Sequence, residues 1–193
     1  MSASNGTPDP TPISAPPALS AHSLDWSLVR RMLPHRGAMA LLDGVESYEP
    51  DHGRVVGFKQ VAGNDSTVAS SDPGDPALPP PLVIEALAQA CGMLMNLEHL
   101  RARGIGIEHL RDPDAFARVE PPPLSVLAES RIVHHGLARP GDTVRLEVRF
   151  ALRRKDLCSF RVEARVGSRL LAGGSMVLAY PPYTARLARG PVT

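Results

Sequence analysis

The 193-residue chain has almost no net charge and few aromatic residues. Its 21 Lys and Arg residues are nearly balanced by 20 Asp and Glu residues, for a formal net charge of +1, and aromatic residues make up only 4%. This balance argues against a dedicated nucleic-acid-binding protein, which usually carries a basic excess or a basic stripe. No apolar run approaches the roughly 18 residues that a membrane-spanning helix needs, so no membrane association is predicted.

Motifs for cofactor binding are also absent from the sequence. Neither the G-x-G-x-x-G pattern nor the P-loop pattern occurs, and the histidines and two cysteines do not have metal-ligand spacing. The sequence therefore predicts no metal, flavin or nucleotide cofactor. Cys91 and Cys158 both lie in apolar surroundings. This favours two buried thiols in a reducing compartment, with a lone disulfide as the alternative.

Residues 1–22 are rich in Pro, Ser and Ala and contain neither a basic start nor an apolar stretch. Prolines remove backbone donors and block helix formation, so we expect a disordered tail rather than a secretion signal. We expect one folded domain over residues 23–183 and a second flexible tail over 184–193. Without a targeting signal, the expected location is the cytoplasm.

The clearest predicted element is a helix over residues 82–100. Its apolar residues occupy every face, so this helix should be surrounded by protein. Strands are predicted on both sides of it along the chain, over residues 38–48, 54–61, 125–134, 144–150, 157–166 and 170–180. The link over residues 104–123 is polar and contains prolines. This order predicts an α+β domain in which a curved antiparallel sheet wraps around one central helix.

Glu85 is the only charged residue between Leu82 and Leu97. The helix N-terminus favours its charged form and burial favours its neutral form, which suits a group that donates and accepts protons. Alternatively, Glu85 accepts backbone N–H bonds at the helix start. Gln89 lies one turn further on the same face and can orient the carboxylate or the substrate, or serve as a plain buried amide.

The backbone N–H groups near the start of this helix are candidates for binding a carbonyl or an oxyanion. They belong to Leu82, Val83 and Ile84. The three residues before them, 79–81, are prolines and supply no donors.

Two motifs resemble those of bacterial 3-hydroxyacyl-[acyl-carrier-protein] dehydratases, the hot-dog enzymes of fatty-acid synthesis. Residues 33–45 read LPHRGAMALLDGV, similar to the opening motif of that family, and residues 82–90 read LVIEALAQA, similar to its central-helix motif. Pro73-Gly74 and Pro140-Gly141-Asp142 match its lead-in loop and the turn before a long strand. The resemblance covers residues 24–181 and implies the hot-dog fold.

The resemblance implies elimination of water from a 3-hydroxyacyl thioester carried on the phosphopantetheine of acyl carrier protein or on coenzyme A. In the family, a His removes the α-proton, a Glu on the partner's central helix assists departure of the hydroxyl, and helix-start N–H groups hold the carbonyl. By position the Glu is Glu85, and Gln89 follows it. The family's His position is occupied here by Ser71, and Asp72 is the adjacent candidate base.

Three hypotheses follow from these residues. The first is a dehydratase of fatty-acid or polyketide-type biosynthesis in which Glu85 is the acid/base, working alone or with Asp72 or another residue as base. The second is a non-catalytic acyl-binding subunit, or a partner that lends Glu85 to a heterodimer with a catalytic homologue. The third is a hot-dog acyl thioesterase. A homodimer is the expected assembly because sheet edges in such folds pair across a two-fold axis.

Overall fold

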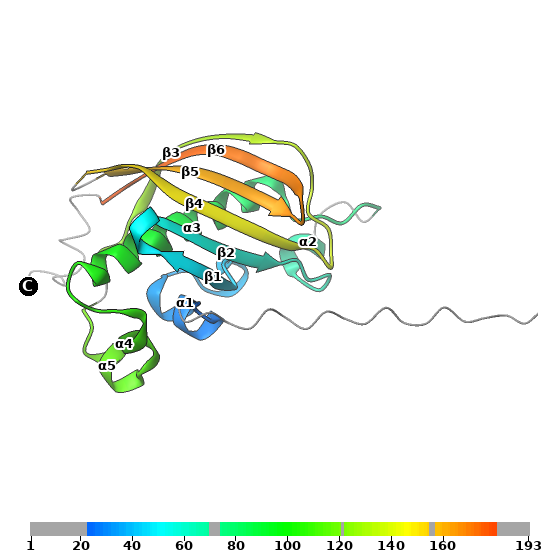
Figure 1. Ribbon diagram of the computed structural model, residues 1–193. Coiled ribbons are helices and arrows are strands. Elements are labelled where there is room, and N and C mark those ends of the chain that lie inside the picture. The colour runs from blue at the N-terminus through cyan, green and yellow to red at the C-terminus, as the bar shows by residue number, and fades with distance from the viewer. Residues whose placement is uncertain (1–22, 70–73, 121, 155–156, 181–193) are drawn as a thin grey trace, which may run out of the picture.

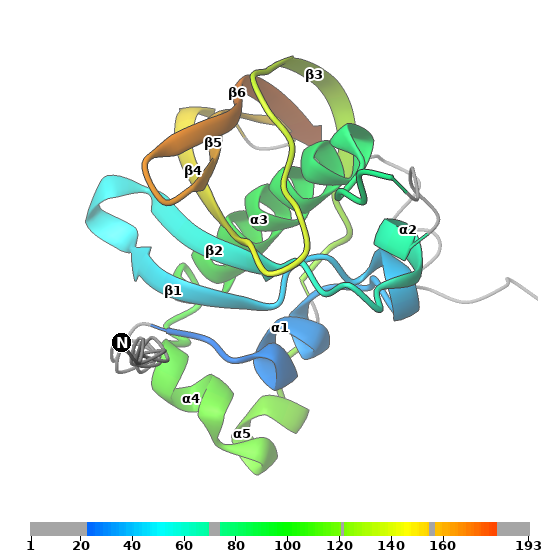
Figure 2. The same ribbon diagram turned by 90° about the vertical axis from the view of Figure 1, so that its right-hand side faces the viewer.

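The computed structural model describes residues 23–69, 74–120, 122–154 and 157–180. The described part contains a six-stranded antiparallel sheet with the strand order β1-β2-β4-β5-β6-β3. The strands are β1 (Gly44–Glu49), β2 (Arg54–Gln60), β3 (Val126–His134), β4 (Thr143–Arg153), β5 (Leu157–Val166) and β6 (Arg169–Ala179). The sheet curves over the long helix α3 (Pro80–Arg101), as Figures 1 and 2 show. This arrangement confirms the predicted α+β hot-dog fold.

The sheet has one apolar face and one charged face because its strands alternate. In β4, Val144, Leu146 and Val148 are fully buried, and the residues between them are partly exposed. Successive side chains of a strand point to opposite faces, so the buried set lies toward α3. Helix α3 contacts β2, β4, β5 and β6 from inside the curve. The core therefore lies between the concave face of the sheet and this helix.

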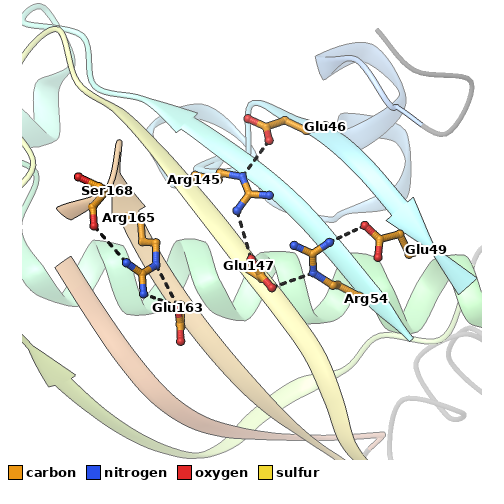
Figure 3. Close-up of polar contacts among 8 residues, drawn as sticks. All are labelled: Glu46, Glu49, Arg54, Arg145, Glu147, Glu163, Arg165 and Ser168. Atoms are coloured by element: carbon orange, nitrogen blue, oxygen red, sulfur yellow. Dashed lines mark hydrogen bonds and ion pairs between the residues drawn. The ribbon is translucent and has the colours of Figure 1, made fainter. Parts of the chain in front are cut away.

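The charged outer face carries a network of ion pairs, shown in Figure 3. Glu147 of β4 accepts hydrogen bonds from Arg54 at 2.7 Å and from Arg145 at 3.1 Å. The bond from Arg54 and the nearby positive charges lower the pKa of Glu147 below its ordinary value. Arg54 also pairs with Glu49, and Arg145 with Glu46. These pairs cross from β4 through β2 to β1.

Helix α3 begins at Pro80, two residues before the predicted start. Pro80 and Pro81 occupy its first two positions, where an N–H group has no helical partner and proline is well tolerated. Most of the helix is buried, as predicted from its apolar residues on every face. Among the described residues, no helix is long and apolar enough to cross a membrane.

Shorter helices lie outside the curved sheet (Figure 2). Helix α1 (Trp26–Met32) is capped by Asp25, whose Oδ1 accepts the N–H of Leu28 at 3.0 Å. Residues 104–123 were predicted to form only a polar link. The structure shows two short helices there, α4 (Ile107–Arg111) and α5 (Pro113–Ala117). Ile107 and Leu110 are buried, so α4 forms because it covers part of the core. A further single-turn helix, α2, spans Ser66–Ala69.

The predicted strand over 38–48 was wrong in its first half. Residues Gly37–Met39 form a 3-10 turn, and β1 starts only at Gly44. The backbone N–H groups of Leu41 and Leu42 bind the side chain of Gln89 on α3 instead of another strand. This tertiary contact replaces the sheet ladder that the apolar sequence suggested.

The predicted tails, 1–22 and 184–193, lie outside the described residues. The described parts of 23–183 form the single layered unit outlined above, and the tail boundaries stay predictions.

Candidate functional site

A cavity of about 270 Å³ lies beside α3. Its walls come from four parts of the chain: α3, the segment that ends α1 and follows it, residues 122–127 at the entry to β3, and Leu178 of β6. The lining includes His35, Glu85, Gln89 and Gly92, together with Ser125 and Leu127 on the β3 side. These segments are far apart in sequence, so the cavity exists only because the sheet wraps around α3.

Glu85 lines this cavity from the second turn of α3, one turn later than the predicted helix start implied. Its side chain is 28% exposed, so it lies neither in bulk water nor in the sealed core. Its Oε1 accepts a hydrogen bond from Gln89 Nε2 at 3.0 Å and lies 3.3 Å from His35 Nε2. The other carboxyl oxygen, Oε2, has no hydrogen bond to a described residue.

Gln89 is held by hydrogen bonds at both ends of its amide. Its Oε1 accepts the backbone N–H groups of Leu41 and Leu42 at 2.9 and 3.2 Å, and its Nε2 donates to Met39 O at 2.7 Å and to Glu85. Only one orientation of the amide satisfies two donors and two acceptors, so the direction of the bond to Glu85 is fixed. Gln89 is 2% exposed, and its Nε2 holds Glu85 Oε1.

His35 is the site residue to which the sequence reasoning gave no role. It lies in the LPHR part of the opening motif, 50 residues before Glu85. Arg36 fixes the backbone there, because its Nη1 donates to Leu33 O at 2.6 Å and to His35 O at 2.7 Å. The motif itself was the available signal, but nothing in the sequence alone placed this imidazole beside the helix.

The helix-start N–H groups expected to bind a carbonyl already have partners. Leu82 and Val83 both donate to Pro79 O, at 2.9 and 3.3 Å. Neither of them nor Ile84 is among the residues lining the cavity. The structure therefore offers no free donor at Leu82 or Val83, and substrate binding by these residues remains an untested prediction.

Ser71 and Asp72 lie outside the described residues. The loop that follows them is tied to the turn before β4. Arg139 donates to both carboxyl oxygens of Asp75 at 2.9 Å, and Leu78 N donates to Ala138 O at 2.8 Å. The hydrogen bond from Arg139 lowers the pKa of Asp75. These contacts fix the entry of the chain into α3.

The two cysteines are free and buried, as the composition predicted. Burial raises the pKa of both thiols, which disfavours the nucleophilic thiolate. Within the described ranges, no group of three or more His, Cys, Asp or Glu side chains could hold a metal ion.

Comparison with known proteins gives the same family as the two motifs. A family model for FabA-like domains matches residues 33–112. The 3-hydroxyacyl-[acyl-carrier-protein] dehydratase FabZ of Legionella pneumophila (strain Corby) is 31% identical over 157 residues, covering 81% of this chain and 94% of the relative. The FabZ protein of Rhizorhabdus wittichii is 32% identical over 162 residues, covering 82% of this chain and 92% of the relative.

Among solved structures, a chain of the dehydratase heterocomplex ApeI:P from Xenorhabdus doucetiae has a similar fold. The TM-score is 0.64 at 20% identity, and the match covers 84% of this chain and 97% of the other. The sequence relatives, the six-stranded sheet and the central helix agree with one another. The chain therefore belongs to the 3-hydroxyacyl-[acyl-carrier-protein] dehydratase family of hot-dog proteins.

Proposed function

We propose that this protein dehydrates 3-hydroxyacyl thioesters in fatty-acid or polyketide-type biosynthesis, with Glu85 as the acid/base. The observation that carries the proposal is the placement of the Glu85 carboxyl, which lines a cavity while one of its oxygens is held by Gln89. Membership of the dehydratase family supports the reaction type. The acyl group is carried on the phosphopantetheine of acyl carrier protein or on coenzyme A, and the chain itself needs no cofactor.

A single carboxylate can carry out both proton transfers of this elimination. Glu85 Oε2 first takes the α-proton, so the C–H bond breaks and its electron pair moves into the thioester. The C–O bond then breaks as the C=C bond forms, and the proton moves from Oε2 to the departing oxygen, giving water. The carboxylate is regenerated and no co-reactant is consumed. This route requires no base at Ser71.

A heteromeric subunit is the second candidate, and two observations favour it. Ser71 occupies the position where the family motif has its histidine. In addition, the start of the edge strand β3 leaves Val126 38% exposed and Leu127 40% exposed beside the cavity. A catalytic homologue paired along this edge would supply the histidine and use Glu85. The similar ApeI:P structure is itself named a dehydratase heterocomplex.

The test follows the absorbance of the conjugated enoyl thioester with 3-hydroxybutyryl and crotonyl groups on acyl carrier protein and on coenzyme A. We expect turnover by the wild-type chain and a loss of about 100-fold or more for Glu85→Gln, since a positioned acid/base contributes roughly that factor. Glu120→Gln is the matched control, because the Glu120 side chain is 76% exposed and does not line the cavity. An unchanged rate in Glu85→Gln rejects the proposal.

The heteromeric candidate predicts inactivity of the chain alone and activity after mixing with a homologue that retains the family histidine. The homologue is prepared with Gln in place of its own helix Glu, so that only Glu85 can complete a site. Activity of that mixture, abolished by Glu85→Gln, supports the heteromer; absence of any complex on co-purification rejects it. Release of free thiol without enoyl absorbance indicates a thioesterase instead and rejects both dehydratase forms.

A further inference from the structure

We propose that His35 is a positioning residue for Glu85. Its Nε2–H donates to Glu85 Oε1, so that Oε1 is held from two sides and Oε2 is left for the substrate. This inference rests on the proposed function, since it assigns Oε2 the proton transfers. It starts from two contacts at Oε1, with Gln89 Nε2 at 3.0 Å and His35 Nε2 at 3.3 Å. Among the described residues, none forms a hydrogen bond with Oε2.

The two nitrogens of His35 have different surroundings, and this decides where the proton lies. Nε2 faces the carboxylate, whereas Nδ1 is buried and has no hydrogen-bond partner among the described residues. A proton on Nδ1 would bury an unsatisfied donor and would turn the bare Nε2 lone pair toward a carboxylate oxygen. Leaving a buried donor unsatisfied costs about 1–3 kcal/mol. The tautomer with the proton on Nε2 avoids both penalties.

In this tautomer His35 is a hydrogen-bond donor to Glu85. It cannot act as the base in place of the family histidine, whose position is occupied by Ser71. A base would need a bare nitrogen directed at the substrate, but the bare Nδ1 of His35 is buried. The imidazole therefore keeps its proton through the reaction. The proton that moves is the substrate's own α-proton, which travels through Oε2 to the leaving hydroxyl.

The two donors to Oε1 are held by separate anchors that share one segment of backbone. Arg36 fixes the backbone of His35, and Gln89 binds the backbone of Met39, Leu41 and Leu42 a few residues later. The segment between α1 and β1 is thus fastened to α3 around Glu85. Since a misplacement of about 1 Å can cost roughly 100-fold in rate, such anchoring has a direct kinetic consequence.

Kinetics of two His35 variants test this role. His35→Phe keeps the ring but removes the donor, and we expect kcat to fall by about 10- to 100-fold, the range of one hydrogen bond to a charged group. We expect KM to change by less than about 3-fold, because the bond acts on Glu85 and not on the bound substrate. His35→Gln presents an amide donor near the Nε2 position and should recover most of kcat.

The matched control is His134→Phe. His134 also has a buried ring nitrogen without a partner among the described residues, but it does not line the cavity. We expect wild-type kinetics from this variant. If His35→Gln is as impaired as His35→Phe, or if the loss appears in KM alone, the positioning role is overturned.

A second measurement needs no activity and separates this inference from the proposed function. Nitrogen-15 NMR of the imidazole, assigned by the loss of its signals in His35→Gln, reports the tautomer directly. We expect a protonated Nε2 and a bare Nδ1. A protonated Nδ1 with a bare Nε2 refutes the inference even if the enzyme is active. If the protein shows the expected tautomer but has no dehydratase activity, the contact between His35 and Glu85 is supported and the proposed function is rejected.

Discussion

Gln89 accepts the backbone N–H of Leu41 at 2.9 Å, although 48 residues separate them along the chain. The same side chain accepts the N–H of Leu42 and donates to Met39 O and Glu85. One buried amide therefore ends the ladder of β1, fastens the preceding segment to α3 and orients the candidate catalytic carboxyl. Gln89 therefore affects both the stability of the fold and the position of Glu85.

Replacing Gln89 with Leu tests how much the hydrogen bonds of Gln89 contribute to the stability of the fold. The change leaves two buried N–H groups and one carbonyl without their partner, so we expect a loss of about 3 kcal/mol or more in the free energy of unfolding. Urea unfolding measures it. The control Gln60→Leu, at an exposed position ending β2, should stay within about 0.5 kcal/mol of wild type. Equal stabilities of the two variants would contradict the contact.

Glu98, near the other end of α3, makes stability depend on pH. Its side chain is 2% exposed and accepts hydrogen bonds from Tyr48, from Arg101 at 3.2 Å and from Arg153 at 2.6 Å. Burial by itself raises the pKa of Glu98, but these hydrogen bonds outweigh burial and hold the pKa below its ordinary value of 4.5. A lowered pKa means that the stabilisation is complete above 4.5 and is lost as pH falls through the folded-state pKa.

We therefore expect Glu98→Gln to lose about 2–4 kcal/mol of unfolding free energy at pH 7, where the buried carboxylate is charged and paired. The difference from wild type should shrink as the pH is lowered from about 5 toward 3. Chemical denaturation across this range measures it, with the exposed Glu120→Gln as control. A difference that is independent of pH would show that the charge on Glu98 is not the cause.

Gly92 lies in the interior of α3 and lines the cavity. A Cβ built there would meet Ser125 Oγ at 3.6 Å and Leu33 Cδ2 at 3.8 Å, which is ordinary contact. Gly92→Ala should therefore raise the free energy of unfolding by about 0.5–1 kcal/mol through helix propensity. Thermal and urea unfolding measure the gain.

The larger Gly92→Leu should fill the cavity and raise KM for acyl thioesters more than Gly92→Ala does. Acyl substrates of increasing length provide the readout in the enoyl absorbance assay. Wild-type KM values for Gly92→Leu would show that the acyl chain does not pass this position.

Two neighbouring glycines of β6 should respond differently to the same change. Gly174 has a φ of +155°, and a Cβ there would lie 2.0 Å from the Arg131 carbonyl oxygen of β3. Gly174→Ala should cost about 3 kcal/mol or more, because backbone must move and the β3–β6 pairing weakens. At Gly173 the nearest atom is 3.6 Å away, so Gly173→Ala should be tolerated. Equal unfolding midpoints in urea would refute this difference.

Sequence reasoning found the elements whose signals are local. The central helix was evident because its residues are apolar on every face, and β4 because Val144, Leu146 and Val148 alternate with charged residues. The start of β1 was misplaced because the backbone of Leu41 and Leu42 bonds to a distant side chain. Helix α4 was missed because a five-residue helix has almost no intrinsic stability and forms through burial of Ile107 and Leu110.

The sequence by itself determined that the domain wraps an apolar helix with a single carboxylate near its start, and its two motifs identified the family. Only the tertiary structure decided what surrounds that carboxylate. His35 and Glu85 are 50 positions apart, and only the closing of the sheet over α3 brings Nε2 to 3.3 Å from Oε1. Periodicity records which face of an element is buried, whereas a contact between two polar side chains from distant segments leaves no periodic trace. The site therefore becomes visible only in the fold.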